Sequence, residues 1–165
     1  MDEILALRPA APDDEAFLFR VYASTRTEEL APVPWSAAQK EAFLMWQAAT
    51  QHRYYIDNYP GAEFQVIVLG EQPIGRLYLH RRPDEIRIMD IALLPEYRRR
   101  GYGTTLLGDI MAEGQRTGRR VTIHVEQFNP ALRLYQRLGF GQVAEHGVYL
   151  LMEWNPDGVG STQER

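Results

Sequence analysis

Apolar and polar residues alternate in several short segments of the chain, and this spacing predicts strands. Alternation, or a brief apolar run between turn residues, is typical of a strand. Seven segments show it: residues 4–8, 63–69, 74–80, 86–94, 120–126, 140–145 and 148–154. The turn that begins at Gly70 and the His146-Gly147 turn each join two of these segments, so we expect antiparallel hairpins there.

Apolar residues at helical spacing predict two helices in the first third of the chain. Asp13 precedes one such pattern and is expected to be its N-cap. Ser36 and Gln39 form a capping-box sequence before the second pattern. The tyrosine-rich residues 54–64 contain a Pro-Gly pair and are expected to form a loop.

Two further helices are predicted nearer the C-terminus, over residues 102–116 and 130–138, with Gly118 just past the end of the first. The strand–helix–strand order over residues 85–126 requires a crossover and a parallel strand pair. The predicted fold class is therefore α/β (α+β), with a mixed, mostly antiparallel central sheet and helices on both faces.

Length and composition narrow the possible functions. The 165 residues suit one domain, expected over residues 1–155 and followed by a disordered tail over 156–165. The net charge of -4 argues against nucleic-acid binding, and the absence of cysteine excludes disulfides, thiolate zinc sites and a cysteine nucleophile. His52, His80 and His146 are scattered along the chain and show no metal-ligand spacing.

The start of the chain carries early acidic residues and no long apolar run, so we expect no signal peptide. No stretch approaches the ~18 apolar residues of a membrane span. These features predict a cytoplasmic protein that acts neither in a membrane nor on nucleic acid.

A Gly-x-Gly pair opens the helix predicted from residue 102. Each glycine there weakens the helix by up to ~1 kcal/mol, but Gly101 and Gly103 would let a ligand approach the backbone closely. Helix N-termini bind phosphate through unpaired amides, here those of residues 99–104. Because 17 of the 18 basic residues are arginines, the Arg98-Arg99-Arg100 triplet is weak evidence for a dedicated charge cluster. A glycine turn with solvated arginines is the alternative.

Two common phosphate loops do not fit this segment. A Rossmann fingerprint requires a third glycine where Leu106 stands, and a P-loop requires a Gly-Lys-Ser/Thr triplet that the chain lacks. The segment RRRGYG instead resembles the Arg/Gln-x-x-Gly-x-Gly/Ala loop of the GCN5-related N-acetyltransferases, with Arg98, Gly101 and Gly103 at the defining positions. The later segment FNPALRLYQRLGF is similar to that family's second motif.

The resemblance is strong over residues 85–141 and looser over residues 1–60. It implies acetyl transfer from the co-substrate acetyl-CoA to an amine, without a metal. It assigns cofactor binding to three segments, the strand before the loop, the loop with the helix start, and the later motif, at Ile91, Leu93, Arg98, Arg99, Arg100, Gly101, Gly103, Thr104 and Asn129. In this family the third and fourth core strands splay apart around the pantetheine arm, and the N–H of Leu93 would polarise the thioester carbonyl.

Tyr135 and Asn129 each have a structural and a functional interpretation. Asn129 precedes Pro130, so it suits a helix N-cap as well as a contact to the CoA arm. Tyr135 shares a helix face with Leu138 and could be core packing. The resemblance implies instead that Tyr135 is the catalytic acid that protonates the leaving thiolate.

The attacking amine must be neutral, so a general base would help. Glu126 ranks first by its position at the end of a strand, and a solvated carboxylate is its alternative interpretation. His124 lies on the same strand face. Asp90 on the preceding strand is a third candidate, although it could instead neutralise an arginine. A water molecule could also serve.

Aromatic and acidic residues within residues 1–60 are candidates for the acceptor side. Tyr54, Tyr55, Tyr59, Trp35 and Glu29 could line a pocket for a cationic amine or simply pack the helices. The predicted activity is N-acetylation of a primary amine on a small molecule, amino acid or peptide, by direct attack in a ternary complex. The alternative is a non-catalytic acyl-CoA sensor or scaffold. The oligomeric state is not fixed, and a homodimer stays open.

Overall fold

The structure is a computed structural model that describes residues 3–157. By its internal packing the chain divides into two compact units that are described separately here. Unit 1 comprises residues 3–78 and 91–98, and unit 2 comprises residues 79–90 and 99–157. Each unit is therefore built from segments that are discontinuous in sequence.

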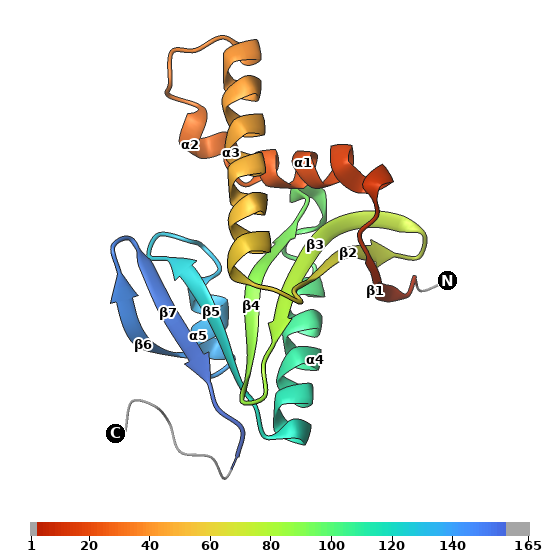
Figure 1. The fold of residues 1–165 in the computed structure, drawn as a ribbon, viewed down its shortest axis with the longest axis vertical. Coiled ribbons are helices and arrows are strands. Elements are labelled where there is room, and N and C mark those ends of the chain that lie inside the picture. The colour runs from red at the N-terminus through yellow and green to blue at the C-terminus, as the bar shows by residue number, and fades with distance from the viewer. Residues whose placement is uncertain (1–2, 158–165) are drawn as a thin grey trace. The chain divides into compact units, whose positions relative to one another are not determined.

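Unit 1 carries the N-terminal helices and the first strands (Figure 1). Its elements, in chain order, are β1 (Leu5–Pro9), the 3-10 turn η1 (Pro12–Asp14), α1 (Glu15–Ser24), α2 (Thr27–Leu30), α3 (Ala37–Asn58), β2 (Glu63–Leu69), most of β3 (Gln72–Arg81), the end of β4 (Glu85–Leu93) and the turn η2 (Pro95–Tyr97). Strand β1 pairs antiparallel with β2, from Leu5 opposite Leu69 to Pro9 opposite Gln65.

Unit 2 carries the crossover and the C-terminal hairpin. It contains the end of β3, most of β4, α4 (Tyr102–Thr117), β5 (Arg120–Glu126), α5 (Leu132–Arg137), β6 (Gly141–His146) and β7 (Tyr149–Trp154). Strand β4 pairs parallel with β5 from Glu85 opposite Arg120 to Ile88 opposite Ile123, and both strands continue beyond that register. Strand β7 pairs antiparallel with both β5 and β6.

The strand order of the sheet is β1-β2-β3-β4-β5-β7-β6. The predicted fold class is confirmed: the sheet is mixed and mostly antiparallel, helices accompany it, and β4-α4-β5 forms the one parallel connection among the described pairings. Pro95 ends the strand as predicted, and Gly118 ends α4 with φ 68°. The capping box of Ser36 and Gln39 is confirmed, with hydrogen bonds of 3.1 and 2.8 Å.

In unit 2, α4 covers the face of β5 that carries Val121. A Cβ placed on Gly114 of α4 would lie 3.2 Å from a Val121 methyl and 3.0 Å from the Trp154 ring. Because side chains alternate along a strand, Thr122 and its neighbours in register lie on the opposite face.

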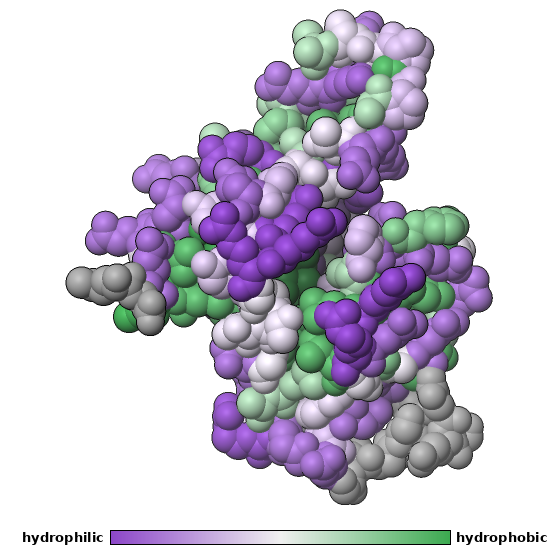
Figure 2. Space-filling model, turned by 180° about the vertical axis from the view of Figure 1, so that it is seen from behind, coloured by the Kyte–Doolittle hydropathy of each residue, from purple (hydrophilic) through white to green (hydrophobic). Residues whose placement is uncertain are grey.

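Figure 2 shows that the surface seen from behind is mostly hydrophilic, with hydrophobic residues in smaller groups.

Three local predictions were wrong. The N-cap of α1 is Asp14 and not Asp13, because η1 occupies residues 12–14. Residues 54–58, expected in a loop, are the last turns of α3. They contain no helix breaker, and the first one is Pro60, which disfavours a helical backbone at Tyr59.

The last helix begins at Leu132 and not at residue 130. Asn129 therefore does not cap it directly. Its Oδ1 atom accepts a hydrogen bond of 2.8 Å from the N–H of Ala131, which stabilises the turn before the helix. Of the tail expected to be disordered, residues 158–165 lie outside the described residues. The N–H of Asp157 donates to Gln115 (2.9 Å).

Candidate active site

Arg98, in the predicted cofactor loop, forms its hydrogen bonds with other residues of unit 1. Its Nε atom donates to the carbonyl of Leu93 (2.9 Å), and its Nη2 atom donates to the Ser24 hydroxyl (3.2 Å). Its backbone N–H closes the η2 turn on the carbonyl of Pro95 (3.2 Å). The side chain of Arg98 therefore fixes the path of the chain between β4 and the loop.

The loop in unit 2 has a backbone suited to an anion. Arg99 and Gly101 both have positive φ angles, 63° and 87°, which L-residues other than glycine rarely adopt. Alternating left-handed residues turn successive amides toward one side and form an anion-binding concavity. The helix dipole of α4 begins directly after it at Tyr102.

Gly103 lies in the first turn of α4, and a Cβ placed there would meet nothing within 4 Å. Packing therefore does not explain the absence of a side chain at this position. The open space is what a ligand needs to reach the amides at the start of the helix. Arg99, Arg100 and Thr104 are exposed at the same loop.

Ile91 and Leu93 lie on the part of β4 that belongs to unit 1. The backbone between them is held close to β3, because a Cβ on Gly75 would lie only 2.3 Å from the carbonyl oxygen of Ala92. The N–H of Leu94 donates to the carbonyl of Ile74 (2.8 Å). Glycine at residue 75 thus sets the position of the β4 backbone where the predicted thioester contacts lie.

Tyr135 is buried in unit 2, 4% exposed, on α5. Its ring meets the edge of Phe140 at a centroid distance of 5.9 Å. Burial raises the pKa of Tyr135 to about 12, and the negative charge of Asp90 adds to this shift. Tyr135 therefore keeps its proton through the neutral and moderately alkaline range, so its hydroxyl is available as a hydrogen-bond donor.

Asp90 and Glu126, two of the candidate bases, differ in their surroundings. Asp90 influences Tyr135 electrostatically. Glu126 ends β5 opposite Tyr149 of β7, and its carbonyl accepts from the N–H of Asn129 (3.0 Å). By strand alternation Glu126 shares a face with His124 and Thr122, away from the face on which α4 packs.

The candidate acceptor residues of unit 1 pack mainly with one another. Tyr54, Tyr55 and Tyr59 form a ring cluster with centroid distances of 6.1–6.4 Å, and Tyr55 meets Tyr78 of β3 edge-on at 6.0 Å. Trp35 meets Phe43 at 5.4 Å. These contacts agree with the packing interpretation and leave an acceptor role for them a prediction.

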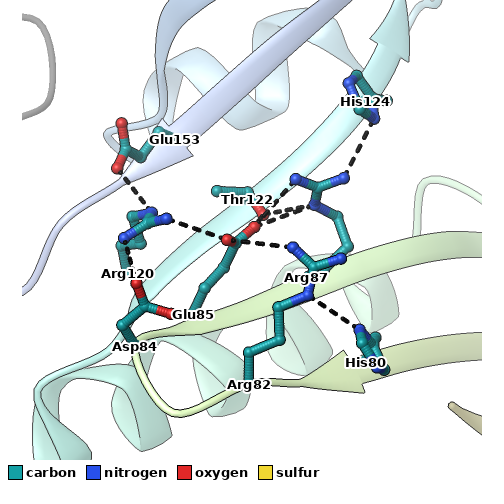
Figure 3. A network of polar contacts seen from close by, with 9 residues as sticks. All are labelled: His80, Arg82, Asp84, Glu85, Arg87, Arg120, Thr122, His124 and Glu153. Atoms are coloured by element: carbon teal, nitrogen blue, oxygen red, sulfur yellow. Dashed lines mark hydrogen bonds and ion pairs between the residues drawn. The ribbon is translucent and has the colours of Figure 1, made fainter. Parts of the chain in front are cut away.

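A polar network in unit 2 was not predicted (Figure 3). Glu85 lies at its centre, buried between β4 and β5, and it contacts Thr122, Arg87, Arg120 and Arg82. The sequence signal for it was the pair Glu85 and Arg87, whose spacing of two residues places both on one strand face. Identifying their partners required the register of β4 on β5.

Neither a metal centre nor a membrane helix is found in the part of the chain that the structure describes. No group of three or more metal-ligating side chains converges within residues 3–157. No helix among these residues combines the length and the apolar character needed to cross a membrane.

Comparison with known proteins identifies the family. Residues 20–140, which include the loop, the crossover and Tyr135, match the acetyltransferase (GNAT) family. The chain belongs to this family. A relative by sequence is the [ribosomal protein bS18]-alanine N-acetyltransferase of Haemophilus influenzae, 31% identical over 78 residues. That match covers 47% of this chain and about half of the relative, 53% of its length.

Solved structures confirm the GNAT fold over almost the whole chain. The PaiA N-acetyltransferase of Thermoplasma acidophilum, in complex with coenzyme A, superposes with a TM-score of 0.68 at 18% identity, over 92% of this chain and 99% of that one. An acetyltransferase of Thermus thermophilus gives the same TM-score at 21% identity, over 94% and 99% of the two chains.

Proposed function

We propose that this GNAT protein transfers an acetyl group from acetyl-CoA to a primary amine by direct attack within a ternary complex. The observation that carries this proposal is the loop before α4. Positive φ angles at Arg99 and Gly101, a helix N-terminus and open space at Gly103 together form a backbone site for the pyrophosphate of CoA.

The arginines of the loop have different proposed roles. Arg98 holds the chain through Leu93 and Ser24, so it acts on the co-substrate through the loop that it positions. Arg99 and Arg100 are exposed and would attract the phosphates from outside. Most of the phosphate recognition would come from the amides of Arg99 to Thr104.

The proposed reaction forms a C–N bond and breaks the C–S bond of the thioester. The backbone N–H of Leu93 would stabilise the developing oxyanion, with the backbone of Ile91 holding the pantetheine arm. Tyr135 would give its proton to the departing thiolate, and its buried, protonated hydroxyl supports that role. Asn129, which precedes α5, would contact the CoA arm.

The amine proton must leave before or during attack. We assign this proton to Glu126, directly or through water. An α-amine has a pKa near ~8 and an alkyl amine near ~10, so an α-amine acceptor would demand less of the base. The Haemophilus relative is named for acetylating an alanine of a ribosomal protein, which supports testing peptide N-termini first.

Transfer of label from isotopically labelled acetyl-CoA to a panel of amines tests the proposal. The panel contains peptides with free and blocked N-termini, free amino acids and polyamines. An acetyltransferase gives a labelled acetamide with one of them. A protein that binds CoA in calorimetry but transfers to none of these amines, nor to those of a cell extract, is the non-catalytic sensor.

A further inference from the structure

Glu85 holds the side chain of Arg87 in one orientation. The Glu85 carboxylate is buried, and it accepts from Arg87 Nη2 (3.0 Å) and Nε (3.2 Å) and from the Thr122 hydroxyl. Burial acts to raise the pKa of Glu85, but the Thr122 hydrogen bond and the charges of Arg87 and Arg120 outweigh it and lower the pKa. Glu85 therefore stays ionised and anchors the guanidinium.

Arg87 reaches outward from this anchor to His124. Its Nε atom also donates to Thr122 Oγ1 (2.6 Å), and its Nη1 atom lies 3.4 Å from His124 Nδ1 (Figure 3). A guanidinium has donors only, so the Nδ1 atom in this contact must be the acceptor. A neutral imidazole whose Nδ1 accepts carries its proton on Nε2.

The other groups around His124 also disfavour its protonation. His146 of β6 meets the His124 ring at a centroid distance of 5.7 Å, and Leu151 of β7 lies opposite in the register. Partial burial of the ring, Arg87 and His146 lower the pKa of His124, while Glu85 alone acts in the other direction. On its own strand face, His124 lies between Thr122 and Glu126.

We propose that Arg87 is a positioning residue that holds His124 neutral, with its proton on Nε2, so that His124 offers the substrate a hydrogen-bond donor and not a general base. While the Arg87 contact lasts, neither ring nitrogen can accept the amine proton. The proton then goes to Glu126, two residues further along the same strand face. The kinetic part of this inference rests on the proposed acetyl transfer, whereas the tautomer of His124 does not.

Nitrogen-15 NMR of histidine-labelled protein tests the tautomer directly, with His124 assigned from a His124→Gln sample. We expect the proton on Nε2 at neutral pH in the wild type. In Arg87→Met we expect the Nδ1–H form to gain population and the pKa of His124 to rise. A proton on Nδ1 in the wild type, or no change in Arg87→Met, overturns the proposal. If Arg87→Met fails to fold, the wild-type spectrum still shows which ring nitrogen of His124 carries the proton.

Arg82→Met is the matched control. Arg82 belongs to the same network, 3.6 Å from Glu85, but its Nε atom donates to His80 Nδ1 (3.1 Å). Its loss should change the spectrum of His80 and leave that of His124 as it was. A change at His124 of the same size as in Arg87→Met would show a general loosening and overturn the specific role of Arg87.

The kinetic test compares His124→Gln, which keeps a donor, with His124→Leu, which removes it. We expect His124→Leu to raise the acceptor KM roughly fivefold to tenfold, about the effect of one hydrogen bond, and His124→Gln to raise it less. The decrease of kcat/KM at low pH should remain in both variants, because it would report the protonation of another group. Loss of this decrease would make His124 the base and overturn the proposal. Absence of transfer in the wild type would instead overturn the proposed function, leaving the NMR result to judge the tautomer.

Discussion

At the scale of single residues, burial decides what Tyr135 can do. Tyr135, on the buried face of α5, could serve only to pack the core, and its ring does pack against Phe140. The same burial raises its pKa to about 12, so the hydroxyl stays protonated over the range in which an amine becomes a free nucleophile. Packing and the proposed acid role would thus both follow from one environment.

Tyr135→Phe separates these two roles. It keeps the ring, so affinity for acetyl-CoA should change little, while kcat should fall ~10²–10⁴-fold, the typical effect of losing a general acid. Single-turnover kinetics together with CoA calorimetry measure both quantities. Tyr22→Phe, which removes the hydroxyl of another buried tyrosine, is the control and should leave kcat unchanged. Wild-type turnover by Tyr135→Phe, with chemistry rate-limiting, would assign Tyr135 to packing.

Asp14 gives a second prediction at this scale. Two hydrogen bonds from Arg8 (2.8 and 2.9 Å) and one from the N–H of Ala11 (2.8 Å) lower the pKa of Asp14 to about 2, against the opposing effect of burial. Because the folded pKa lies below the ordinary value of 3.8, the ionised carboxylate stabilises the protein above that value. This contribution is lost as pH falls from 3.8 to about 2.

Asp14→Asn should therefore lower the free energy of unfolding at pH 7 by about 1.5–3 kcal/mol, the usual size for hydrogen bonds to charged groups. The difference from wild type should shrink below pH 4 and be smallest near pH 2. Urea unfolding across this range measures it. Asp13→Asn, at the exposed neighbouring residue, is the control. A difference between Asp14→Asn and wild type that is independent of pH would refute the role of the carboxylate.

At the scale of elements, the loop before α4 shows local strain placed where a ligand is expected. Arg99 has a positive φ without being glycine, and Gly101 and Gly103 both weaken the start of the helix. Residues held in rarely populated backbone regions cluster at ligand sites, where the strain pre-organises binding. The loop thus combines a cost in local stability with positive φ angles at the place where the pyrophosphate is proposed to bind.

Gly103→Val should raise the Kd for CoA about 10- to 100-fold, because a branched side chain would occupy the space at the amides. The fold should survive, since a Cβ at Gly103 meets nothing within 4 Å. Gly108→Val is a matched control on the same helix, at another glycine that faces open space. It should cost similar helix stability without affecting calorimetric affinity. Equal affinity in the two variants would place the phosphates elsewhere.

At the scale of the whole molecule, the two units share strands. β3 and β4 each begin in one unit and end in the other, and the chain passes between the units after residues 78, 90 and 98. Neither unit is a continuous piece of sequence. A strand that belongs to both units couples their unfolding through its own backbone.

We therefore expect one cooperative unfolding transition, which would also support the predicted single domain. Scanning calorimetry should give a calorimetric enthalpy equal to the van't Hoff enthalpy, the criterion for two-state behaviour. Matching transitions by fluorescence and far-ultraviolet circular dichroism provide the control. Two separate transitions would show that the units unfold independently and would contradict the single-domain prediction.

Elements with local causes could be predicted from the amino-acid sequence alone. Ser36 and Gln39 start α3, Gly118 ends α4, and Pro95 ends β4, because capping, positive φ and a missing N–H act within a few residues. The GNAT motifs also lie in continuous segments, so the family and the residues of the loop could be predicted. The errors, at Asp13, at the end of α3 and at residue 130, all concern the boundaries of elements, which local signals define less sharply than their interiors.

Only the tertiary structure decided what each side chain faces. Sequence spacing placed His124 and Glu126 on one strand face, but the register of β4 on β5 brought Arg87 to His124 and buried Glu85 beside Thr122. The raised pKa of Tyr135 likewise depends on burial and on Asp90, 45 positions earlier in the sequence. Protonation states depend on desolvation and nearby charges, and both are properties of the folded chain, because residues distant in sequence supply them.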